Sequence, residues 1–91
     1  MAVSGPAPNP RTWKLGGNHT ARQWAGKMAR RGWTGLQIDE AIADGRKCSA
    51  TNLIHPENLA TRHVHPTTGR SVVVDDVTGE VIHVGGDDFL Y

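Results

Sequence analysis

Cysteine is nearly absent from this chain of 91 residues, because Cys48 is the only one. A single cysteine excludes an internal disulfide framework and a CxxC metal clip, so nothing in the sequence requires an oxidising compartment. No apolar run approaches the roughly 18 residues that a membrane-spanning helix needs. The opening MAVSGPAPNP also lacks the apolar core of a signal peptide. We therefore expect no membrane segment and, if the domain is exported, delivery by a segment outside this chain.

Acidic residues are missing from the first 38 positions, which carry six basic residues. Residues 39–91 carry four basic and nine acidic residues, so the net charge of +1 is the difference 6 − 5. A basic N-terminal part favours a nucleic-acid-binding face on one element. The alternative, at about equal weight from charge alone, is that the two parts pair with each other across the fold.

Proline and alanine are frequent at the start of the chain, where residues 1–12 are predicted to be a flexible lead or linker. Residues 13–91 are predicted to form one small domain. A chain of this size buries roughly 60–65% of its unfolded surface, which is near the lower limit for a stable core without staples.

Two short helices are predicted between residues 18 and 45. The first carries apolar residues at three-to-four spacing, begins at a cap on Asn18 or Thr20 and ends at Gly32. The second begins with a capping box formed by Thr34 and Gln37 and ends at the next glycine. The two helices are therefore expected to meet at a tight corner.

The second half of the chain changes from helical spacing to alternation. Residues 46–59 show no period and are predicted to be a long loop with a short extended piece at 52–54. Strands are predicted over 60–65, 70–75 and 80–84, with a possible edge strand at 89–91. Because the turns between them are short, we expect an antiparallel meander. The fold class is α+β, with two N-terminal helices packed on a small antiparallel sheet.

Three stretches of the sequence are familiar in combination: RRGWTGLQIDEAIADG, ATRHVHPTTGRSVVVDDVTGEVIHVGG and the closing DDFLY. Over about residues 13–91 they resemble the ribonuclease domain of colicin E-five and its relatives, the C-terminal toxin modules of contact-dependent inhibition and other polymorphic toxins. The resemblance implies a fold of the barnase, EndoU and RelE-like group and metal-free cleavage of tRNA in the anticodon loop.

The same resemblance implies partners and a location. We expect tRNA as substrate and a cognate immunity protein that blocks the site. The domain would be exported as part of a larger toxin and delivered to the cytoplasm of a target bacterium. We expect it to need no cofactor and to be monomeric when free.

The resemblance also assigns residues. The family's RGW arginine falls on Arg31, but Gln23 stands where the family has a lysine in its first helix. Either Arg22 or Lys27 substitutes, or the activity is weakened. A further family lysine from the long loop has Lys47 as its nearest counterpart. The departure at Gln23 supports an alternative, which is a catalytically inactive RNA-binding variant.

Metal-free RNA cleavage needs groups that stabilise charge on the phosphate attacked by the 2′-OH. Arginine suits this task, because it is permanently charged and presents a planar fork to phosphate oxygens. Arg31, Arg62 and Arg70 are the candidates. For the two strand arginines the alternative is an exposed charge paired with Glu80 or Asp76.

Proton transfer is a task for histidine, whose pKa lies near neutrality. His63 and His65 share one face of a predicted strand and Arg62 faces the other way. Arg62 and His65 therefore meet only if the alternation breaks before the following proline, and on that condition His65 is a catalytic candidate. His83 is a weaker candidate, because a half-buried sheet histidine is the commoner outcome. A metal site at His63 and His65 lacks a third ligand at diagnostic spacing.

RNA binding is expected to rest on phosphate contacts and on base stacking. Aromatic residues are scarce, so Trp33 at the helix corner, Trp13 and Tyr91 are the stacking candidates, and Cys48 has no patterned partner for nucleophilic chemistry. A third alternative is a non-enzymatic module whose acidic part docks a partner. The candidates for phosphate contacts are Lys14, Arg22, Lys27, Arg30 and Arg70.

Overall fold

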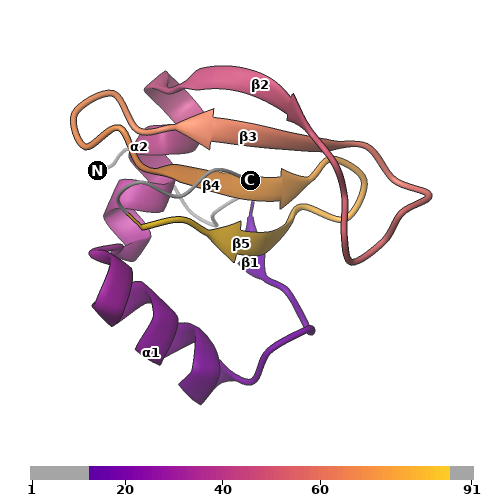
Figure 1. Ribbon diagram of the computed structural model, residues 1–91, viewed down its shortest axis with the longest axis horizontal. Helices are drawn as coiled ribbons and strands as arrows, with labels where there is room; N and C mark the ends of the chain where they lie inside the picture. Colours follow the sequence, from indigo (N-terminus) through magenta and orange to yellow (C-terminus); the bar gives the residue numbers. More distant parts are fainter. Residues whose placement is uncertain (1–12, 87–91) are drawn as a thin grey trace, which may run out of the picture.

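The fold consists of one mixed sheet and two helices, as seen in a computed structural model that describes residues 13–86. The α+β class and the packing of both helices on a small sheet are confirmed. Figure 1 shows α2 behind β3 and β4, and α1 beside β5. The elements in chain order are β1 (Lys14–Leu15), α1 (Ala21–Arg31), α2 (Gly35–Asp44), β2 (Arg46–Ala50), β3 (Ala60–Val64), β4 (Ser71–Asp75) and β5 (Glu80–Val84).

Both helices begin as their local sequence predicts. The hydroxyl of Thr20 accepts from the N–H of Gln23, whose side chain accepts from the N–H of Thr20, and Thr34 and Gln37 repeat this capping box on α2. Gly32 ends α1 at φ 75°, in the left-handed region that a residue without Cβ adopts without strain. This glycine creates the tight corner between the helices.

The sheet has the order β1-β5-β4-β3-β2, and it corrects the prediction in two places. Strands β2 to β5 are antiparallel, but β1 runs parallel to β5, so the sheet is mixed rather than a pure meander. Strand β2 occupies part of the predicted loop at 46–59. Its residues RKCSA do not alternate in polarity. As an edge strand, β2 is held by backbone pairing with β3 and buries few of its side chains, so it needs no alternating pattern. The predicted lead at 1–12 and edge strand at 89–91 lie outside the described residues.

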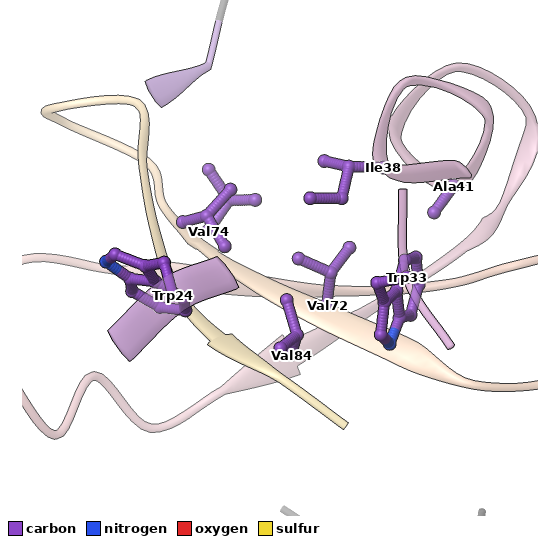
Figure 2. Packing of buried hydrophobic residues seen from close by; sticks show 8 residues of the cluster. Trp24, Trp33, Ile38, Ala41, Val72, Val74 and Val84 are labelled. Carbon is purple, nitrogen blue, oxygen red and sulfur yellow. The ribbon is translucent and has the colours of Figure 1, made fainter. Parts of the chain in front are cut away.

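The main core lies between the helices and the sheet. Figure 2 shows the indoles of Trp24 and Trp33 on either side of the valines of β4 and β5. Each indole N–H donates to a backbone carbonyl, from Trp24 to Gly16 at 2.8 Å and from Trp33 to Gly85 at 2.7 Å. The two rings therefore fix the backbone just after β1 and just after β5. The fully or nearly buried members are Trp24, Trp33, Ile38, Ala41, Val72, Val74, Val81 and Val84.

The opposite side of the sheet, called here the distal face, has a smaller apolar cluster of Ala60, Val73 and Ile82. A β-bulge in β5 helps to form it. Val74 pairs with Val81 and Val73 pairs with His83, so Ile82 is the extra residue of the bulge. The bulge turns two successive side chains, Ile82 and His83, toward the face that Val73 occupies.

A buried carboxylate organises one end of the molecule. Asp75 has no exposed surface and accepts from the side-chain amides of Asn52 and Asn58 and from the N–H groups of Val77 and Thr78. Burial alone raises the pKa of Asp75, but these hydrogen bonds hold it well below its usual range. Asp75 therefore ties the β2–β3 loop to the β4–β5 turn as an ionised carboxylate.

No helix within residues 13–86 is long and apolar enough to cross a bilayer.

Candidate active site

The outer surface of α1 is a basic hollow. It encloses about 510 Å³, and every charged side chain at its wall is a cation or a histidine. Within residues 13–86, Arg22, Lys27 and Arg30 form no hydrogen bond or ion pair, so their charges remain available to a ligand. The hollow, called here the α1 hollow, is lined by His19, Arg22, Gln23, Gly26, Lys27 and Arg30.

Arg31 extends the positive charge from α1 to the sheet. Its Nη1 donates to the carbonyl of Val84 at 2.7 Å. Val84 is at the end of β5, past the two residues of β5 that pair with β1. The stem of the same side chain lies against Gly86. A guanidinium carries five donors, so one bond to a carbonyl leaves most of its fork for a phosphate. Arg31 thus stands at the junction of the α1 hollow and the distal face.

His83 lies next to this junction on the distal face. Burial, followed by the positive charges of Arg31, Lys27 and His19, lowers the pKa of His83 to about 4. The imidazole is therefore neutral at pH 7. Its environment shows that the basic groups of α1 and the side chain of His83 share one region.

Arg62 occupies the same face two strands away. In the register, Arg62 pairs with Val73, and Val73 pairs with His83. Neighbouring strands lie about 4.8 Å apart, so the backbones of Arg62 and His83 are separated by roughly 10 Å across Val73. Val73 between them is fully buried.

The structure does not bring His65 to this place. The strand alternates regularly, so His65 lies on the helix side and is buried, whereas Arg62 lies on the distal face. Nε2 of His65 is 2.9 Å from the carboxylate of Glu40, and Nδ1 of His65 accepts from the N–H groups of Thr67 and Thr68. Both ring nitrogens are therefore engaged in holding the β3–β4 turn against α2.

Three other residues with predicted roles have positions that serve the fold. Lys47 is on the helix side of β2 and donates to the carbonyl of Ile42 at the end of α2, where a cation complements the helix dipole. The side chain of Gln23 caps α1 at the rim of the hollow. Trp33 is 5% exposed and packs in the core, so its ring offers no face to an RNA base.

Arg70 and Lys14 flank the region from two sides. Nη1 of Arg70 lies 3.5 Å from the carbonyl of Gly32, which places a second guanidinium beside the corner that bears Arg31. Lys14 is exposed and is in register with Glu80 at the start of β5. Arg70 therefore borders the corner between the helices, and Lys14 borders the distal face.

His63 is buried on the helix side, and among residues 13–86 its Nδ1 has no hydrogen-bond partner. Burial, followed by the charge of Lys47, lowers the pKa of His63, so this ring is neutral at pH 7. Within residues 13–86 no group of three or more histidine, cysteine or acidic side chains is arranged to hold a metal ion.

The sequence did not indicate that His83 lies beside the basic residues of α1. A histidine inside EVIHV reads as an ordinary sheet residue, because the bulge that directs it to the distal face has no local signature. The sequence signal was the basic run between residues 22 and 31, which indicates a charged surface on the first helix.

No family model, curated protein or solved structure shows significant similarity to this chain.

Proposed function

We propose that this chain is a metal-independent endoribonuclease toxin domain that cleaves tRNA in the anticodon loop. The products are a 2′,3′-cyclic phosphate and a 5′-OH end. The observation that carries the proposal is the meeting of the α1 hollow, Arg31 and neutral His83 beside the distal face that bears Arg62. The choice of tRNA and of the anticodon loop rests on the motifs that resemble colicin E-five.

The cations divide into binding and reacting groups. Arg22, Lys27 and Arg30 line an open surface, which suits successive phosphates of a single strand. Arg31 and Arg62 approach the distal face, where they stabilise the charge that develops on the attacked phosphate. Such donors contribute about 3–4 kcal/mol each to lowering the barrier.

The neutrality of His83 suits a hydrogen-bonding role. An uncharged imidazole can donate one hydrogen bond and accept one, and it does not compete with the arginines for the phosphate. With a pKa near 4, it is a weak acceptor of the 2′ proton. His83 is therefore assigned to substrate orientation rather than to proton abstraction.

The second candidate function is RNA binding without cleavage, and the state of Gln23 favours it. The amide oxygen of Gln23 accepts from the N–H of Thr20 at 2.8 Å and so belongs to the cap of α1. A lysine there cannot accept this bond. Gln23 thus serves helix stability at a position where the resembling family carries a reactive lysine.

The proposal extends to partners and delivery. A domain that cuts tRNA is toxic to the cell that makes it, so we propose a cognate immunity protein. We also propose that a larger toxin carries the domain to the cytoplasm of a target bacterium. Both proposals rest on the resemblance to colicin E-five.

The test is incubation with total tRNA in the presence of EDTA, followed by separation of the fragments on a gel. Wild-type protein should cut a subset of tRNAs. Arg31→Ala should reduce the rate about 10²-fold, since it removes an oxyanion donor. The control is Arg46→Ala, which removes an exposed charge on the far edge strand and should leave the rate unchanged. Intact tRNA bound to excess protein supports the second candidate function instead.

A further inference from the structure

A histidine and a glutamate meet on the distal face at a place that no sequence motif indicates. His55, in the β2–β3 loop, has its Nε2 3.1 Å from Oε1 of Glu80 at the start of β5. Burial alone raises the pKa of Glu80, but hydrogen bonds from Thr78, His55 and the N–H of Gly17 lower it. The carboxylate is therefore ionised at neutral pH.

The ionised carboxylate fixes the tautomer of His55. Because Glu80 can only accept, Nε2 carries the proton and donates it to the carboxylate, and Nδ1 is left as the acceptor. Within residues 13–86 no group donates to this Nδ1, and the side chain of His55 is 37% exposed. An imidazole held by a carboxylate, with its second nitrogen turned away from it, is the arrangement of a general base.

The loop that carries His55 is anchored rather than loose. The side-chain oxygen of Asn52 accepts from the N–H of His55 at 2.7 Å, and its amide donates to the buried carboxylate of Asp75 at 2.9 Å. The backbone of His55 is thus connected through two hydrogen bonds to the buried carboxylate of Asp75. A base held in this way keeps its position when substrate binds.

The pair lies on the same face as the candidate site. Along β5, Val81 points into the main core, so the preceding Glu80 points to the distal face. Arg62 and His83 are on that face, and Lys14 is in register with Glu80. The face therefore carries an oriented imidazole, the guanidinium of Arg62 and the neutral ring of His83.

We propose that His55, oriented by Glu80, is the general base of the RNA cleavage assigned above. Nδ1 of His55 takes the proton of the 2′-OH as the 2′ oxygen forms a bond to phosphorus. The bond from phosphorus to the 5′ oxygen breaks, and the leaving oxygen takes a proton from water. His55 then returns its proton to the solvent. This inference rests on the proposed function, because the substrate is the same RNA.

His55→Gln and Glu80→Gln are the variants that test the pair. The glutamine amide at 55 can still donate to Glu80, so the loop keeps its tie while the base is lost. Glutamine at 80 keeps an acceptor oxygen for His55 but removes the charge that fixes the tautomer. We expect kcat to fall about 10²–10⁴-fold for the first variant, with KM and the melting temperature close to wild type.

Two further readouts separate a base from a structural tie. The acid limb of the wild-type pH–rate profile should disappear in His55→Gln, and added imidazole should restore part of the activity of His55→Ala. The control is Glu57→Gln, an exposed charge change in the same loop that should leave kcat unchanged.

The outcomes are distinguishable. If wild-type protein cleaves tRNA and His55→Gln cleaves it at a similar kcat, the dyad proposal is overturned and the proposed function stands. A loss of kcat that follows the loss of melting temperature, without imidazole rescue, also overturns it. If wild-type protein cleaves no RNA, the proposed function fails and the dyad proposal fails with it.

Discussion

Helix α1 and the β2–β3 loop are both polar, but they use their polar groups in opposite ways. The loop turns its amides inward, so that Asn52 and Asn58 satisfy the buried carboxylate of Asp75. On α1, Arg22 and Lys27 point outward into a hollow that is lined by no acidic residue of the described range 13–86. Satisfied groups stabilise the fold, whereas cations without partners within residues 13–86 are suited to an external anion. The inward-facing groups therefore build the fold, and the outward-facing cations are the groups that we propose contact RNA.

The largest effect is expected at the centre of the inward-facing network. Asp75→Ala leaves the amides of Asn52 and Asn58 and two backbone N–H groups without their acceptor. We expect a loss of about 3–5 kcal/mol in the free energy of unfolding. Urea denaturation measures it. Asp76→Ala is the matched control, since the neighbouring carboxylate is exposed and, in the described part of the chain, accepts a hydrogen bond only from Thr61. Similar losses for both variants would contradict the role of Asp75.

On the outward-facing side, the change should appear in binding and not in stability. The triple variant Arg22→Gln, Lys27→Gln, Arg30→Gln removes three cations from the α1 hollow. The slope of log K against log salt for a single-stranded RNA should become shallower by about 2, because each lost phosphate contact contributes about 0.7. Fluorescence anisotropy over a salt series measures the slope. Arg46→Gln is the control, and an unchanged slope in the triple variant would show that RNA does not use the hollow.

A smaller effect is expected from acid, and it concerns the imidazoles of His63 and His83. The pKa values of His63 and His83 are lowered in the folded state, so the unfolded chain binds protons more readily below the ordinary value of 6.5. The contribution of these two histidines to the free energy of unfolding should therefore be fully present above pH 6.5 and should be lost as the pH falls toward 4. His83→Gln should flatten part of this decline in thermal melts between pH 7 and 4. If the variant shows the same decline as wild type, the assigned environment of His83 is wrong.

Local features of the sequence were predictable, and long-range ones were not. The boxes at Thr20 and Thr34 and the glycine at position 32 act within one helical turn, so their structural consequence can be read directly. Strand β2 was missed because its pairing with β3 depends on residues 10 to 18 positions away. The same limit applies to short β1, whose partner β5 lies more than 60 residues further along the chain.

The same difference between local and long-range features applies to the candidate site. Alternation correctly indicated that Arg62 and His65 lie on opposite faces, and the basic run of α1 indicated a charged surface. The tie between His55 and Glu80 spans 25 residues and depends on how Asp75 holds the loop, which no spacing rule describes. The bulge that turns His83 to the distal face is a property of two paired strands and not of one.

The most direct test of the account is to map the ends of tRNA fragments produced by the wild-type protein in EDTA. We predict cleavage at one phosphodiester within the anticodon loop of a few tRNAs, with a 2′,3′-cyclic phosphate on the upstream fragment. Uncut tRNA at saturating protein, or cleavage that needs a divalent metal, would contradict the central claim that the cations and imidazoles of this fold act on RNA without a metal ion.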